Sequence, residues 1–360
     1  MQKVDKEKAE KVLRMANEKP VYQDDTIGAS IDSILRGSHK TYRYVLVTSL
    51  LAKSTNKDVD ILSLQAKDDS AGAYDARSLC HKVIVPFERS TYPNSLGGSN
   101  EPFLNKPARF QRLAKTNAVR SGNDSETLES LIKILSEIQT KKQAFKYLSS
   151  ALCSLRDIYS EIEEKYSIPD LEIEDEANPQ SILDYVNTLI KNSFEGEMCP
   201  LVVAAIEHLY YYKGEKTVVP HKVNESGASS KEVGDIDIFD NAEQLVSSIE
   251  VKDKDFTKED VEHAITKFAL AQIEKSLFIF GKHVNFEQHD VYETAAELGK
   301  KGYFCSVVSI MDFVRMRLYS MNGDVTINRL AHLLLEYARQ INAKDETIEW
   351  IKTCTTEFGL

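Results

Sequence analysis

Two consecutive stretches of alternating polar and apolar residues lie in the second half of the 360-residue chain. The alternation at 233–239 and 245–252 is typical of β-strands with one buried face, and the polar residues 240–243 between them predict the turn of a hairpin. Around this hairpin the pattern predicts helices and strands in the order helix 181–191, helix 200–212, then helix 257–271, strand 276–280, helix 290–300 and strand 303–310, with three helical stretches after them. This order predicts an α/β (α+β) fold with a mixed central sheet flanked by helices.

Helical periodicity dominates the first half of the chain, which predicts a mostly helical region there. Helices are expected at 6–17 and 42–53, and one or two long amphipathic helices over 126–162. Between them, residues 66–124 hold most of the glycine and proline signals, which predicts a long, ordered, loop-rich segment.

An acidic, proline-bracketed run at 168–179 interrupts the two patterns. Domain boundaries usually fall in such polar linkers. We therefore expect an N-terminal helical and loop region at 1–170 and an α/β domain at 171–360.

The charge of the chain is unevenly distributed. The net charge is −11, which argues against a protein that coats nucleic acid by bulk charge alone. However, residues 77–120 contain eight basic and two acidic residues, whereas residues 156–199 contain three basic and twelve acidic residues. The acidic average therefore hides a basic loop region.

Nothing in the sequence indicates export or a membrane partner. The first residues are charged and lack the apolar core of a signal peptide. The apolar stretch 198–206 is less than half as long as a membrane span requires. The five cysteines lie far apart and form no CxxC pair, which argues against a zinc site and a disulfide framework. We therefore expect a cytoplasmic protein with reduced thiols.

The predicted hairpin carries a concentrated set of charged side chains. Successive side chains of a strand point to opposite faces, so Asp235 shares a face with Asp237, and Glu250 shares a face with Lys252. Pairing the two strands brings carboxylates and an ammonium group together at one end of the sheet. Gly234 precedes the first acid, where a close approach of the backbone would be useful.

These groups suit the hydrolysis of a phosphodiester. A hard divalent cation binds carboxylate and carbonyl oxygens, neutralises the scissile phosphate and lowers the pKa of a bound water. Asp235 and Glu250 would supply the carboxylates, the main-chain carbonyl of Val251 a third oxygen, and Lys252 would orient the water and stabilise the developing charge. The pattern indicates a metal-dependent nuclease, and a solvated strand face is the alternative that the residues alone leave open.

Three further acids are candidates for an auxiliary role. Glu197 lies just before the predicted buried helix 200–212, where a carboxylate would also complement the helix dipole. Glu225 lies in a polar loop that would either contact DNA or merely connect elements. Asp237 would hold a structural position or act as a second metal ligand.

Several blocks of the chain match a known pattern. The N-terminal blocks are Ala9-Glu10-Lys11-Val12-Leu13-Arg14, Thr41-Tyr42 with Leu46 to Ala52, Arg77-Ser78-Leu79-Cys80-His81 with Val83 and Val85-Pro86, and Glu101-Pro102 with Asn105 and Pro107. The catalytic block is Gly234-Asp235 followed by Glu250-Val251-Lys252. With these blocks the chain resembles the SacI family of type II restriction endonucleases, which are members of the PD-(D/E)xK nuclease superfamily.

The resemblance implies a type II restriction endonuclease with a PD-(D/E)xK fold. Such an enzyme would use Mg²⁺ to hydrolyse double-stranded DNA at a short, palindromic site, for which GAGCTC is the first candidate. A palindrome implies a homodimer, and the host would need a cognate DNA methyltransferase. The basic region then becomes a candidate DNA-binding segment, with Arg77, Lys106 and Arg109 as first candidates because arginine reads guanine and basic side chains contact phosphates.

The chain departs from the resembled pattern in one place and leaves other functions open. The type sequence of the family has Glu-Val-Arg-Gly-Lys where this chain has Glu250-Val251-Lys252-Asp253-Lys254. Lys252 and Lys254 share a strand face, and the superfamily pattern favours Lys252 as the catalytic lysine. The alternatives are a structure-directed repair or junction nuclease of the same superfamily, and an inactive DNA-binding module, which the intact Asp235, Glu250 and Lys252 argue against.

Overall fold

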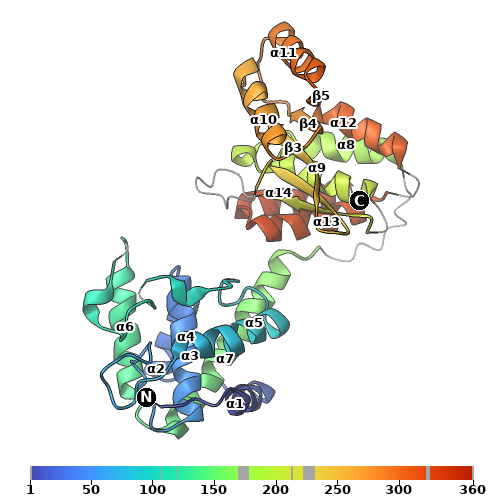
Figure 1. Cartoon of the computed structure of the whole chain (residues 1–360). Helices are drawn as coiled ribbons and strands as arrows, with labels where there is room; N and C mark the ends of the chain where they lie inside the picture. The colour runs from blue at the N-terminus through green and yellow to red at the C-terminus, as the bar shows by residue number, and fades with distance from the viewer. Residues whose placement is uncertain are drawn as a thin grey trace. The chain divides into compact units, whose positions relative to one another are not determined.

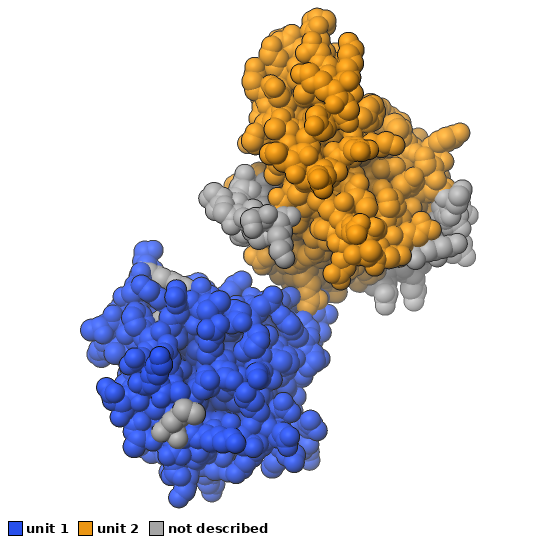
Figure 2. Space-filling view, viewed as in Figure 1, with its two compact units in different colours: residues 1–164 blue, residues 165–360 orange. Residues whose placement is uncertain are grey.

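The chain divides into two compact units, residues 1–164 and residues 165–360 (Figure 2). The computed structural model describes residues 2–106, 108–119, 121–168, 178–211, 214–221, 232–321 and 325–358. Glu225 and most of the acidic run at 168–179 lie outside these residues. Within the described ranges, no helix is both long and apolar enough to span a bilayer.

Helices are the main regular elements of unit 1, which confirms the predicted helical region. The elements are α1 (Lys6–Glu18), α2 (Thr26–Arg36), α3 (Lys40–Thr55), α4 (Ala76–Leu79), the π-helix η1 (Cys80–Ile84), α5 (Val85–Thr91), the 3₁₀ turns η2 (Pro102–Leu104) and η3 (Lys115–Asn117), α6 (Asp124–Glu137) and α7 (Lys141–Lys165). Helix α3 is buried on nearly every side, and α1, α2 and α6 all contact it. The hydrophobic core of this unit is therefore organised around α3.

A buried carboxylate fixes a loop of unit 1 to this core. Glu88 on α5 is 2% exposed, and its Oε1 accepts the N–H groups of Leu96, Gly97 and Gly98 at 2.9, 3.1 and 3.0 Å. Its Oε2 accepts the hydroxyl of Tyr44 on α3 at 2.6 Å. Since a buried charge is costly unless it is hydrogen-bonded, these donors make Glu88 a structural anchor.

The loop prediction for residues 66–124 is wrong in part. Residues 76–91 form one continuous helical run, made of α4, η1 and α5. Pro86 does not break it, because this residue lies in the first turn of α5 directly after the wider π-turn, where a missing N–H costs little. The sequence pattern also did not predict helix α2 or strand β1 (Lys216–Pro220).

Unit 2 is built on a five-stranded mixed sheet of order β1-β2-β3-β4-β5. Strands β1, β2 (Ile236–Asp240) and β3 (Leu245–Lys252) pair antiparallel, and β3, β4 (Lys275–Phe280) and β5 (Phe304–Ser309) pair parallel. The helices are α8 (Pro179–Leu189), α9 (Met198–Tyr210), α10 (Lys258–Leu270), α11 (Gln288–Lys300), α12 (Ile310–Ser320), α13 (Ile327–Ile341) and α14 (Asp345–Phe358), with a 3₁₀ turn η4 (Phe194–Gly196). The predicted α+β fold with a mixed sheet is confirmed.

Helices cover both faces of this sheet (Figure 1). On one face, Ile249 and Val251 of β3 pack into a core shared with α8, α9, α12, α13 and α14. On the other face, Phe278 of β4 packs with α10 and α11. Strand β3 lies in the middle of the sheet, between β2 and β4. The charged residues at the end of β3 are therefore held between two rigid layers.

Candidate active site

The hairpin of β2 and β3 brings two acids close together. Ile236 pairs with Ile249 in antiparallel register, and the N–H of Asp235 donates to the carbonyl of Ile249 at 3.0 Å. The paired register ends at Ile236, and Asp235 lies beside the end of β3, close enough for the carboxylate of Glu250 to affect its ionisation. The structure thus brings together the two carboxylates that the sequence singled out.

Lys252 joins this pair from the same face of β3. Its Nζ donates to Oε1 of Glu250 at 2.6 Å, and the two side chains are 23% and 14% exposed. Burial alone would lower the pKa of Lys252, but the charges of Glu250 and Asp235 outweigh this effect and raise the pKa above its ordinary value. Lys252 is therefore an ammonium ion at neutral pH, which suits a donor to anionic oxygens.

The carboxylate of Asp235 is held by the backbone of β3. Its Oδ2 accepts the N–H of Val251 at 2.8 Å. Burial, and after it the nearby carboxylate of Glu250, raise the pKa of Asp235 to about 6. A carboxylate whose ionisation is opposed by burial and by a neighbouring carboxylate favours a bound cation.

A cavity of about 500 Å³ opens at the end of β3, beside these residues. Asp235, Val251 and Lys252 line it, and Glu250 contacts one of these lining residues, Lys252. Lys254 also lines the cavity, but it is exposed, and among the described residues no carboxylate contacts it. The geometry therefore distinguishes the two candidate lysines, because only Lys252 touches the acids.

One wall of the cavity has an unusual backbone conformation. Phe194, Glu195 and Gly196 have φ angles of 47°, 57° and 94° in succession, and the last two line the cavity. Left-handed backbone at non-glycine residues costs of order 1–3 kcal/mol each and is concentrated at functional sites. No pattern in the sequence predicted this wall.

Asp237 does not reach the cavity. It is fully buried, and it accepts the N–H groups of Val233 and Gly234 at 3.0 Å and the hydroxyl of Ser248 at 2.6 Å. A Cβ atom on Gly234 would lie 2.3 Å from Oγ of Ser248 and 2.7 Å from the carbonyl oxygen of Ile249. The backbone at Gly234 therefore makes its close approach to β3. Asp237 holds the backbone segment directly before Asp235 through its hydrogen bonds to Val233 and Gly234.

Glu197 is directed away from the paired acids. Its Oε2 accepts the N–H of Lys344 at 3.0 Å and the hydroxyl of Thr347 at 2.6 Å. Both donors lie at the start of α14, where backbone N–H groups need an acceptor. The structure therefore places this predicted auxiliary acid at a helix N-terminus.

Sequence reasoning missed Asp253 and His283. Asp253 lines the cavity, accepts the N–H of His283 at 3.1 Å and lies 3.0 Å from Nδ1 of that ring. The two residues follow the ends of β3 and β4, which are parallel neighbours, so both loops meet at one edge of the sheet. The signal was present, since polar residues follow two predicted strands within three positions.

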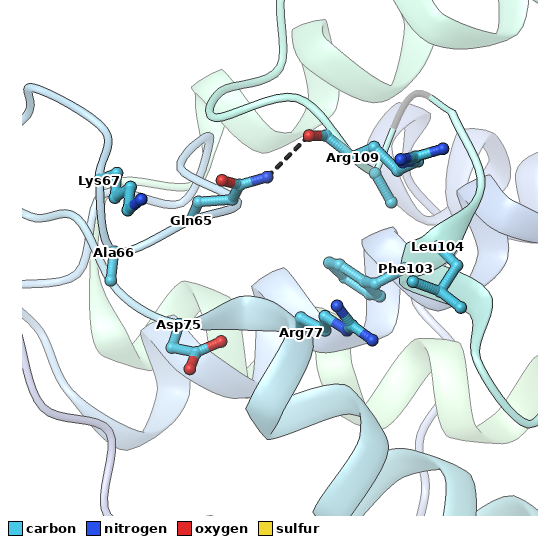
Figure 3. A pocket seen from close by; sticks show the side chains of 9 residues that line it. Gln65, Ala66, Lys67, Asp75, Arg77, Phe103, Leu104 and Arg109 are labelled. Atoms are coloured by element: carbon cyan, nitrogen blue, oxygen red, sulfur yellow. Dashed lines mark hydrogen bonds between the residues drawn. The ribbon is translucent and has the colours of Figure 1, made fainter.

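The basic candidates of unit 1 differ in their surroundings. Arg77 lies 3.4 Å from Glu101 in an ion pair whose side chains are 53% and 40% exposed. Lys106 is exposed, with Nζ 6.0 Å from the centre of the Phe110 ring. Arg77 and Arg109 line the same pocket (Figure 3), and Lys106 does not line it.

Two family models match the chain. The N-terminal domain of the SacI restriction endonuclease matches residues 6–159, and its C-terminal domain matches residues 176–282, which include the paired acids and Lys252. The type II restriction enzyme SacI of Streptomyces achromogenes is 21% identical over 327 residues, which are 87% of this chain and 86% of that protein. The chain therefore belongs to the SacI family of type II restriction endonucleases.

Proposed function

We propose that this enzyme uses Mg²⁺ to hydrolyse phosphodiester bonds of double-stranded DNA at a short palindromic sequence. The observation that carries the proposal is the constellation at the end of β3. Asp235 lies near Glu250 at the end of β3, and Lys252 contacts Glu250 at 2.6 Å beside a cavity of about 500 Å³. Metal-dependent phosphodiester hydrolysis needs this combination of carboxylates and a positioned cationic donor.

The donor set at this site fits a magnesium ion. Asp235 and Glu250 would hold it, together with the main-chain carbonyl of Val251. Within the described ranges, no group of three or more His, Cys, Asp and Glu side chains is placed to hold a metal. A site with few protein ligands suits Mg²⁺ better than zinc, because Mg²⁺ prefers oxygen ligands and keeps several bound waters. When bound, the ion would neutralise phosphate charge and lower the pKa of water.

The protein groups around this site have separate roles. Lys252, as an ammonium ion, would donate to the attacking water or to the phosphate oxygens where negative charge develops. Asp237 would keep Asp235 in position through the backbone of Val233 and Gly234. The hydrogen bond from Val251 to Asp235 would leave the other carboxylate oxygen to face the cavity.

The partners follow from this activity. A palindromic site implies a two-fold symmetric homodimer. Arg77, Lys106 and Arg109 of unit 1 would contact the DNA, and a cognate methyltransferase in the cytoplasm would protect the host DNA.

A cleavage assay on unmodified DNA tests the proposal. Full-length protein is incubated with plasmid and phage DNA in Mg²⁺ or in EDTA, beside Asp235→Asn and a control, Asp290→Asn. Asp290 is an exposed carboxylate of the same unit that lies 3.4 Å from Lys258. We expect discrete fragments from the wild type and the control in Mg²⁺ alone.

Other results would contradict it. Fragments in EDTA, or wild-type cleavage by Asp235→Asn, would exclude the proposed metal site. A smear or nicking would indicate a structure-directed nuclease, and a gel shift without cleavage would indicate an inactive DNA-binding module.

A further inference from the structure

A second pocket, of about 440 Å³, lies within unit 1 (Figure 3). Its walls are residues 65–67, the beginning of α4, the 3₁₀ turn η2 and residues 108–109. Its volume lies in the range of sites for small ligands, about 300–1,000 Å³. The paired acids of unit 2 take no part in it.

Backbone hydrogen bonds hold the walls of this pocket together. The N–H of Leu64 donates to the carbonyl of Gln111 at 2.8 Å, and the N–H of Leu113 donates to the carbonyl of Leu62 at 2.9 Å. The side-chain amide of Gln65 donates to the carbonyl of Arg109 at 2.7 Å, across the pocket wall. The pocket is therefore formed before any ligand enters.

The pocket combines an apolar wall with a hydrogen-bond acceptor at its edge. Phe103 is 4% exposed, and Figure 3 shows its ring directed into the pocket, with Leu104 beside it. Asp75 uses Oδ1 to accept the N–H of Ser78 at 2.9 Å, which leaves Oδ2 as an acceptor for a ligand. Such an interior suits a planar ring that carries an amino group.

The rim of the pocket is cationic. Lys67, Arg77 and Arg109 line it together with one acid, Asp75. In the part of the chain that the structure describes, neither Lys67 nor Arg109 contacts a carboxylate, and Arg77 has only the loose pair with Glu101. Cations around an apolar pocket with an acceptor at its edge fit a base whose flanking phosphates remain outside.

We propose that this pocket receives a nucleobase turned out of the DNA duplex, one that bears an exocyclic amino group, while Arg109 and Lys67 bind the adjacent phosphates. The proposal rests on DNA being the substrate. A concave pocket cannot read a base inside the stack, because base edges in a groove are reached by protruding side chains. An unstacked base fits such a pocket between apolar and aromatic side chains and presents its polar edge to acceptors.

Fluorescent base analogues in the mapped cleavage site test the proposal. Each purine is replaced in turn by 2-aminopurine and each cytosine by pyrrolocytosine, and the DNA is bound in Mg²⁺ by Lys252→Ala, so that it stays intact. We expect a several-fold rise in fluorescence at one symmetry-related pair of positions. Adding Leu104→Trp, which fills the pocket mouth, should abolish the rise. Adding Met15→Trp, at a residue that is 61% exposed on α1, should not.

A second variant keeps the test independent of folding. Asp75→Asn retains the acceptor for Ser78 and changes only the group offered to the base. We expect discrimination at the extruded position to fall by about tenfold in cleavage assays. Titration with each free mononucleotide is the other arm, because a pocket for a free nucleotide would share this chemistry.

The outcomes separate this proposal from the proposed function. Site-specific cleavage without fluorescence change at any position would overturn extrusion and leave the nuclease assignment intact. Fluorescence that persists with Leu104→Trp, or tight binding of a free nucleotide without extrusion, would also overturn it. No cleavage of any DNA by the wild type would instead remove the function on which the proposal depends.

Discussion

Replacing Lys252 by alanine is expected to remove most of the activity and leave DNA binding nearly intact. Nζ of Lys252 lies 2.6 Å from Glu250, and its side chain is 23% exposed, so the charge acts in a largely desolvated site. Loss of one positioned donor of this kind costs about 2.7–4 kcal/mol in the barrier, or about 10²–10³-fold in rate. Lys254 is exposed on the rim of the same cavity, and its loss should cost less than about 1 kcal/mol.

The comparison of Lys252→Ala with Lys254→Ala needs three measurements. Single-turnover cleavage of a labelled duplex in Mg²⁺ gives the rate, a gel shift in EDTA gives the affinity, and urea unfolding checks that both variants fold. A larger loss of rate in Lys254→Ala would reverse the assignment of the catalytic lysine. Wild-type rates in both variants would mean that the end of β3 is not the catalytic site.

Three other substitutions test separate parts of the molecule. Arg109→Ala should weaken DNA binding and lower the slope of log K against log salt by about one; an unchanged slope would remove this residue from the phosphate contacts. Gly281→Ala should reduce the free energy of unfolding by about 1–3 kcal/mol, since its Cβ would lie 2.1 Å from Asp253; an unchanged urea midpoint would contradict this packing. Glu88→Ala should cost at least about 3 kcal/mol, because it leaves three backbone N–H groups and the hydroxyl of Tyr44 without their acceptor; a smaller loss in the same measurement would show that water replaces the carboxylate.

Regular elements with a strong period were predictable. Strand β3 occupies the predicted residues 245–252, and α10 begins and ends within one residue of the predicted helix. In both cases the alternation or helical repeat coincides with the buried face. Periodicity does not predict the helix where its backbone is irregular, as in the π-helix η1 before Pro86. A proline in the sequence indicates a helix break, although here the helix continues.

The candidate site was predictable for a related reason. Asp235 directly precedes β2, and Glu250 and Lys252 lie on β3, so the predicted hairpin already implied that these side chains lie close together. Asp237 shares that pattern, yet it is completely buried. The alternation indicates a face of the sheet, and it does not indicate how deep each position on that face lies.

Residues far apart in the chain set the remaining features. Glu197 forms a hydrogen bond with Thr347, 150 positions away, and Asp253 forms one with His283, 30 positions away. The pocket of unit 1 likewise joins residues 65–67 to residues 103–104 and 108–109. Local patterns arise from backbone geometry and therefore identify strands, helices and faces. Burial depth, partner choice and cavities arise from packing between distant segments, so they become defined only when the whole chain has folded.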